Sequence, residues 1–158
     1  MKNNPLLQLC AMLLASMFFY AALVKLMDYE LAQASMRKQV FPLPIADVLS
    51  WLIPVLELLT VLLLLFRPSQ RLGLWSSFVL LIAFTVYIVI AMNGTFGDRP
   101  CSCGGILQHL SYPWHIAFNL LFLGISIVGL CLSRQIKQSA VQRYLMNIEA
   151  GIGIHPDI

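Results

Sequence analysis

The sequence predicts an all-α integral membrane protein, a four-helix bundle that forms one domain over residues 1–158. Of the 158 residues, 59% are apolar and 11% are charged. Soluble domains average about 45–50% apolar and about 25% charged residues. Four almost uncharged runs, at 6–24, 48–66, 72–92 and 114–133, are 19, 19, 21 and 20 residues long. Each run matches the roughly 20 residues with which a helix crosses the apolar core of a bilayer.

The first run is predicted to be a retained span that reaches residue 27. A basic residue before the run and the small residues at 32–34 are also features of a cleavable signal peptide. The run is longer than the about 7–15 apolar residues of such a signal, and charged residues separate it from position 32. The segment 28–39 contains helix formers, so we expect it to extend the first helix until Pro42 and Pro44 stop it.

The distribution of lysine and arginine predicts the orientation, because short cytoplasmic loops retain positive charge. Six basic residues fall in the N-terminal tail, the second loop and the C-terminal tail: Lys2, Arg67, Arg71, Arg134, Lys137 and Arg143. Four fall on the other side: Lys25, Arg37, Lys38 and Arg99. This bias predicts cytoplasmic termini, with the first and third loops outside. The short connection at 67–71 makes the second and third spans an antiparallel hairpin.

Composition also argues against two other classes. The net charge of +3 comes from ten scattered basic residues. No basic stripe alternates with aromatic residues, so no nucleic-acid partner is predicted. The longest connection between runs, about 23 residues, is too short for a separate soluble domain. Membrane lipid and other membrane or extracytoplasmic proteins are the predicted partners.

The third loop contains a Cys-x-Cys motif formed by Cys101 and Cys103, which lie between Pro100 and two glycines. A buried cysteine usually acts as a small hydrophobe, but this pair lies in a glycine-rich turn on the predicted oxidising side. A disulfide across one residue closes a strained ring, and strain makes a disulfide easier to reduce. Arg99 nearby favours a thiolate. The motif therefore favours thiol–disulfide exchange.

Two other interpretations of the cysteine pair remain open. The pair could be a static disulfide, within the loop or to another subunit. A metal site is the weaker alternative, because zinc prefers four ligands and only His109 lies nearby as a third; no metal is predicted. Cys10 and Cys131, near the cytoplasmic ends of their spans, are predicted to be packing residues.

Ionisable and polar residues inside the spans need an explanation, because each is costly in a bilayer. Glu57 lies three residues after Pro54, so both face the same side of the second span. The proline frees a carbonyl and kinks the helix, which can open a polar pocket. An ion pair between Glu57 and Lys25 that fixes helix register, and a role in a proton relay or quinone pocket, are both open.

Two further polar residues, His115 and Asn119, lie one turn apart at the outer end of the fourth span. His115 can accept a thiol proton near neutral pH. Asn119 can hydrogen-bond a quinone carbonyl or another helix. The topology predicts that both lie near the cysteine pair. Trp51 and Trp114 are predicted to belong to the interfacial aromatic belt.

These motifs together resemble the MauE branch of the DoxX-like membrane proteins, over about residues 6–133. The resemblance rests on the first-span sequence at 20–26, Pro54-x-x-Glu57, Cys101-x-Cys103-Gly104-Gly105, and Trp114 with Asn119. It implies a bacterial cytoplasmic (inner) membrane protein involved in disulfide formation or maturation of exported proteins, often beside a thioredoxin-like partner. It also implies that Cys101 and Cys103 form the redox pair, and Lys25, Glu57 and Asn119 match the family's polar positions.

The predicted function is disulfide exchange outside the cytoplasmic membrane with a thioredoxin-fold periplasmic protein. Cys101, Cys103, Glu57 and His115 are the candidate catalytic residues. Lys25 and Asn119 are the candidate cofactor-binding residues, with a quinone as the candidate electron acceptor. The alternative is a non-enzymatic membrane anchor or assembly subunit with a structural Cys-x-Cys, or a small carrier with Glu57 as its proton site. Whether the protein is an enzyme stays open at this point.

Overall fold

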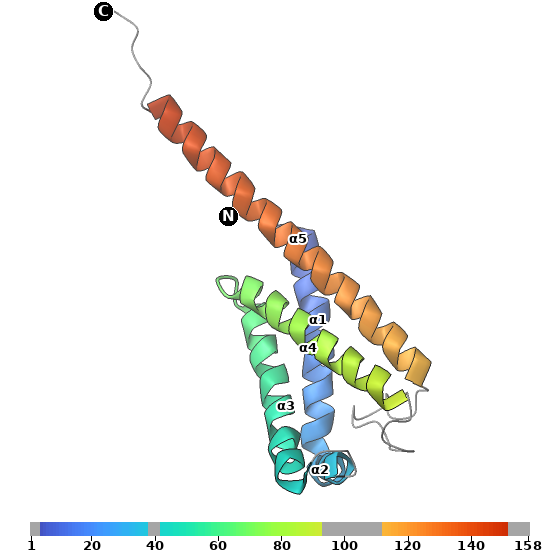
Figure 1. The fold of residues 1–158 in the computed structure, drawn as a ribbon. Coiled ribbons are helices and arrows are strands. Elements are labelled where there is room, and N and C mark those ends of the chain that lie inside the picture. The colour runs from blue at the N-terminus through green and yellow to red at the C-terminus, as the bar shows by residue number, and fades with distance from the viewer. Residues whose placement is uncertain (1–3, 38–41, 93–111, 152–158) are drawn as a thin grey trace, which may run out of the picture.

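The computed structural model describes residues 4–37, 42–92 and 112–151. They form five helices: α1 (Pro5–Met27), α2 (Tyr29–Arg37), α3 (Leu43–Leu65), α4 (Gln70–Met92) and α5 (Tyr112–Gly151). In this part of the chain α1, α3, α4 and α5 are long and apolar enough to cross a membrane. They pack together, which confirms the predicted all-α membrane bundle (Figure 1).

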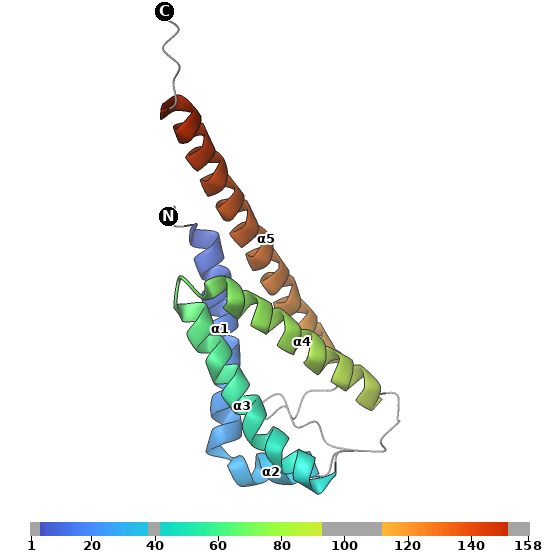
Figure 2. The ribbon, with the colours of Figure 1, turned by 60° about the vertical axis from the view of Figure 1, so that its left-hand side comes forward.

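The long helices form a ring in which α1 and α4 each pack against both α3 and α5. Residues 66–69 join α3 to α4 at one end of the bundle, which we call the hairpin end. At the opposite end, which we call the α2 end, α1 and α4 end and α3 and α5 begin (Figure 2). Both cysteines of the Cys-x-Cys motif lie outside the described residues, in the connection from α4 to α5.

The expectation that residues 28–39 extend the first helix is wrong, because α2 is a separate helix that lies across the end of the bundle (Figure 1, Figure 2). The chain turns at Asp28, whose φ of −114° and ψ of 53° are not helical. The turn brings α2 onto α3, where Gln33 and Arg37 donate hydrogen bonds to Asp47. The hydrogen bond and charge of Asp47 raise the pKa of Arg37. These contacts are lost if α2 continues the line of α1.

The two prolines expected to end a helix instead begin α3. Pro42 is the N-cap residue of α3, and Pro44 lies in its first turn. Proline is tolerated there because the first backbone N–H groups of a helix have no intrahelical acceptor. In α1, Pro5 occupies the same kind of position, and the Asn4 side chain accepts a hydrogen bond from the Leu6 N–H at 3.1 Å.

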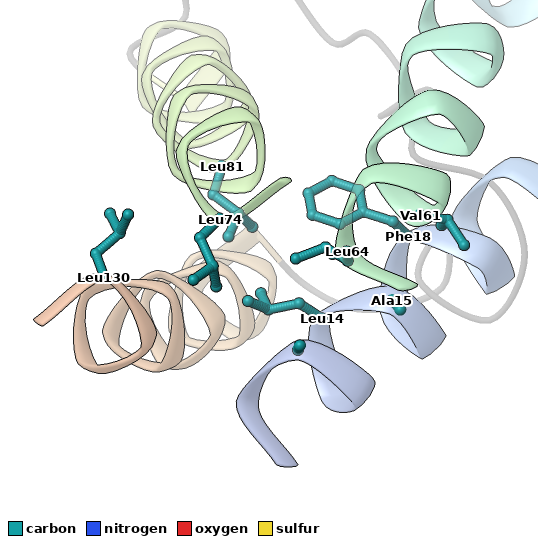
Figure 3. Packing of buried hydrophobic residues seen from close by; sticks show 9 residues of the cluster. Leu14, Ala15, Phe18, Val61, Leu64, Leu74, Leu81 and Leu130 are labelled. Atoms are coloured by element: carbon teal, nitrogen blue, oxygen red, sulfur yellow. The ribbon is translucent and has the colours of Figure 1, made fainter. Parts of the chain in front are cut away.

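The apolar core lies toward the hairpin end. It is formed by small, branched and aromatic side chains of all four long helices (Figure 3): Ala11, Leu14, Ala15, Phe18, Val61, Leu64, Leu74, Leu81 and Leu130. Hydroxyl groups add contacts between helices there. Thr60 and Ser76 are hydrogen-bonded at 2.6 Å, and Ser126 donates to the Leu74 carbonyl at 3.1 Å. Such bonds contribute about 0.6 kcal/mol each in membrane bundles.

Gly73 brings α4 into direct contact with the backbone of α3. A Cβ atom at this position would lie 2.7 Å from the Leu64 nitrogen and 2.8 Å from the Leu63 carbonyl carbon. No ordinary side chain fits that space. The two helices are therefore held together near the hairpin, and they diverge toward the α2 end (Figure 2).

Replacing Gly73 with Ala is expected to destabilise the bundle by about 1–3 kcal/mol, the usual cost of overpacking. The added methyl group would clash with backbone atoms of α3, which cannot move aside as a flexible side chain can. Gly124→Ala is the matched control, since nothing lies within 4 Å of a Cβ there. Removing that helical glycine should leave stability unchanged or raise it by up to about 1 kcal/mol. Thermal unfolding of the purified protein in detergent measures both. Equal melting temperatures for the two variants would contradict the close α3–α4 contact.

The fourth span is part of a longer helix than the apolar run predicted. α5 continues to Gly151, 18 residues past the predicted end at residue 133, and this extension projects beyond the bundle (Figure 1). Cys10 is buried in α1, as expected of a packing residue. Cys131 is exposed on α5, and its role as a small membrane-packing residue stays a prediction.

Candidate functional site: a polar cavity within the bundle

A cavity of about 350 Å³ lies among the four long helices at the α2 end of the bundle. Most of its wall is apolar or aromatic: Met17, Phe18, Ala21, Met36, Leu49, Ile53, Leu80, Leu81, Ala83, Phe84 and Phe118. The polar residues in the wall are Lys25, Glu57, Tyr87, His115 and Asn119. Its volume lies in the roughly 300–1,000 Å³ range of small-molecule sites.

The cavity follows from how the helices are held at the two ends. At the hairpin end, the glycine contact draws α3 and α4 together, and the core side chains Phe18 and Leu81 close that side of the cavity. Toward the α2 end, the helices are further apart (Figure 2). There the large rings of Phe84 and Phe118 line the space between them.

An ion pair between Lys25 of α1 and Glu57 of α3 forms one edge of the cavity. The Lys25 Nζ donates a hydrogen bond to Glu57 Oε1 at 2.5 Å. Their side chains are only 8% and 1% exposed. The same ammonium group lies 5.6 Å from the ring centroid of Phe84 on α4, which is within the range of a cation–π interaction. Of the two alternatives that the sequence left open, the structure therefore contains the ion pair.

The second carboxylate oxygen of this pair has no partner within the described part of the chain. Glu57 Oε2 is buried and accepts no hydrogen bond from any described residue. A buried acceptor left without a donor costs about 1–3 kcal/mol. Glu57 Oε2 can therefore accept one further hydrogen bond.

Local sequence explains why α3 presents Glu57 to the interior. The buried residues of α3 recur every three or four positions, which is the spacing of one helix face: Ala46, Ser50, Pro54, Glu57, Thr60, Val61 and Leu64. Pro54 is on this stripe, so the expectation that it shares a side with Glu57 is confirmed. Proline cannot donate the backbone hydrogen bond that α3 would otherwise make at this point.

His115 and Asn119 form a second polar edge, on α5. They are 3% and 7% exposed, lie one turn apart, and both line the cavity. Four of the six site residues predicted from the sequence are thus brought to one cavity: Lys25, Glu57, His115 and Asn119. Trp114, which precedes this edge, is 69% exposed, as expected of a residue in the interfacial belt.

Sequence reasoning missed the contribution of α4. Tyr87 and Phe84 line the cavity from this helix. Tyr87 could have been predicted as a site residue, because it is the only tyrosine in the run 72–92. Phe84 could not have been singled out in this way, since it is one of several aromatic residues in the same span.

These observations define a class of protein: a multi-pass helical membrane protein with a small, partly polar cavity between its spans. Among the described residues, no group of three His, Cys, Asp or Glu side chains is placed to hold a metal ion. A family model described as methylamine utilisation protein MauE matches residues 3–132, which is most of the chain. The protein belongs to the MauE family. No match was found among curated proteins or solved structures.

Proposed function

We propose that this MauE-family protein exchanges disulfides with a thioredoxin-fold protein through Cys101 and Cys103, outside the bacterial cytoplasmic membrane. Its main support is that five polar residues, Lys25, Glu57, Tyr87, His115 and Asn119, line one cavity at the α2 end, and that the segment containing both cysteines is attached at this same end. The segment with the two cysteines therefore joins two helices, α4 and α5, that both line the cavity.

The attachment points of the cysteine segment lie close in sequence to two residues of the cavity wall. The segment 93–111 follows the last residue of α4 and precedes the first residue of α5. Tyr87 lies five residues before the end of α4, and His115 lies three residues after the start of α5. Both line the cavity. The six-to-four distribution of basic residues supports an extracytoplasmic location for this end of the bundle.

The proposed reaction needs no further reactant. A thiolate of one protein attacks a disulfide sulfur of the other, giving a mixed disulfide, and the second thiol of the attacking pair then resolves it. Two electrons and two protons pass from the dithiol to the disulfide in one complete exchange. The direction is set by the reduction potentials of the two pairs. With one residue between its cysteines, the loop pair forms a strained ring that suits exchange rather than permanent bracing.

The experiment that tests this function titrates the cysteine pair in intact spheroplasts. The protein carries Cys10→Ser and Cys131→Ser, so that only the loop thiols react. After equilibration in glutathione buffers of graded redox ratio, a membrane-impermeant maleimide should label Cys101 and Cys103 increasingly as the buffer becomes more reducing. A variant that also lacks both loop cysteines should take up no label and should accumulate in the membrane at the wild-type level.

Two outcomes contradict the proposal. Labelling only after the membrane is broken would place the pair in the cytoplasm. A pair that stays oxidised in buffers that reduce thioredoxin-fold proteins would be a static disulfide.

A further inference from the structure

We infer that the cavity binds the ring of a membrane quinone, and that Glu57 Oε2 accepts a hydrogen bond from a hydroxyl group of the reduced form. This inference deepens the proposed function by naming the small molecule with which the cysteine pair exchanges electrons, and only that electron transfer rests on the proposed function. The binding site itself consists of described residues alone.

The Glu57 carboxylate has one oxygen without a partner in the described part of the chain. Glu57 is 1% exposed, Lys25 Nζ donates to its Oε1, and no described residue donates to Oε2. A carboxylate in an ion pair can only accept hydrogen bonds. The ligand must therefore supply an O–H or N–H group at this edge. A hydroquinone has such a hydroxyl on its ring.

The wall of the cavity is mostly aromatic and aliphatic. Phe18, Phe84 and Phe118 present aromatic surface, and the remaining lining is largely aliphatic. The charge of Lys25 is already paired with Glu57, so an anion gains no free cation here. A sugar or a phosphate would bring more polar groups than the two edges can satisfy. A planar apolar ring with a few oxygens fits this wall.

The two polar edges of the cavity lie on different helices. One edge comes from α1 and α3, and the other, formed by His115 and Asn119, comes from α5. An amide and an imidazole can donate to a carbonyl oxygen or accept from a hydroxyl group. A quinone carries oxygens at opposite sides of one ring, so its two ends can be recognised by different helices. The cavity lies between four candidate membrane spans, a position that suits a ligand dissolved in the lipid phase.

The redox chemistry of the proposal balances. Oxidation of the Cys101 and Cys103 thiols to a disulfide releases two electrons and two protons. Reduction of one quinone to its hydroquinone consumes the same number of each. The residues of the cavity bind and orient the ring, and Glu57 is positioned beside the hydroxyl proton.

The test is equilibrium binding of decylubiquinone and decylubiquinol to the full-length protein in nanodiscs, by titration calorimetry. Wild-type protein should bind both saturably, with one site per chain. Glu57→Gln should weaken decylubiquinol binding about tenfold or more, because a neutral amide replaces a charged acceptor, and should weaken decylubiquinone much less. Glu30→Gln is the matched control: it makes the same change at an exposed residue outside the cavity wall, and both affinities should stay at the wild-type value.

A second variant protects the test against a folding defect. Asn119→Leu should weaken decylubiquinone binding while the protein keeps its melting temperature, because it replaces the amide on the second edge by an apolar group of similar size. The absence of saturable binding to wild-type protein would overturn the inference. Equal affinity for decylbenzene, which has the same tail and no ring oxygens, would also overturn it by showing that the cavity takes any apolar molecule.

Failure of the site and failure of the proposed function can be told apart. The Cys101→Ser/Cys103→Ser protein should bind both probes as wild type does. If it does so but the wild-type loop pair never titrates in glutathione buffers, the quinone site stands and disulfide exchange is rejected. If the pair titrates but no probe binds, disulfide exchange stands and the quinone site is rejected.

Discussion

Lys25→Met is expected to destabilise the bundle by about 3–5 kcal/mol, the cost of removing one partner of a buried ion pair. The variant leaves the Glu57 carboxylate without its only described donor, at a position that is 1% exposed. Glu57 lies near the middle of its helix, so its short side chain cannot reach water. Thermal unfolding in detergent measures the effect, and the same loss should appear as reduced accumulation in the membrane.

Glu57→Gln should be much less harmful than Lys25→Met, although it breaks the same pair. Lys25 lies two residues before the end of α1, and a lysine near a helix end can extend its ammonium group to the interface. The double variant Lys25→Met/Glu57→Gln should recover most of the stability lost in Lys25→Met, since no buried charge then remains.

The exposed pair Arg37–Asp47 provides a matched control for the loss of a cation. Its side chains are 48% and 38% exposed, so Arg37→Met should cost a small fraction of what Lys25→Met costs. If the two variants melt at the same temperature, the buried ion pair does not hold α1 against α3.

How much of this fold could be predicted depends on which interactions decide each element. The four spans follow from the apolar runs, because a bilayer demands about 20 apolar residues whatever the neighbouring helices are. Pairing of Lys25 with Glu57 was among the predictions for a similar reason: they are the only charged residues in the predicted spans 6–27, 48–66, 72–92 and 114–133. Each of these two charged residues therefore has only one residue of opposite charge in the predicted spans with which it can pair.

The elements that sequence reasoning missed depend on tertiary contacts or on a different physical criterion. Helix formers at 28–39 suit a continuous helix and a separate one equally well, and the hydrogen bonds from Gln33 and Arg37 to Asp47 select the second. The extension of α5 was missed because an apolar run measures a membrane span, whereas a helix can continue through polar residues. The cavity depends on the divergence of α3 and α4, which one close glycine contact helps to set.

The largest functional effect is expected at the cysteine pair, which lies outside the described residues. Cys103→Ser should abolish turnover, because serine cannot resolve a mixed disulfide. The Cys101 thiol remains and should stay joined to its partner, so the variant should convert a transient intermediate into a stable covalent adduct. The Cys101→Ser variant shows whether the Cys103 thiol can also form a stable adduct with the partner. The double variant should also lose turnover but form no adduct, while keeping the wild-type melting temperature.

The most direct measurement of disulfide exchange is the identity of what Cys103→Ser captures. The variant is expressed in a Cys10→Ser/Cys131→Ser background, free thiols are blocked at lysis, and membrane proteins are separated without reductant. The expected result is a dithiothreitol-sensitive adduct, joined through Cys101, whose second component is a thioredoxin-fold extracytoplasmic protein by mass spectrometry. The contradicting result is that neither single variant yields an adduct although both accumulate and fold as wild type, which would make the Cys-x-Cys motif a structural element.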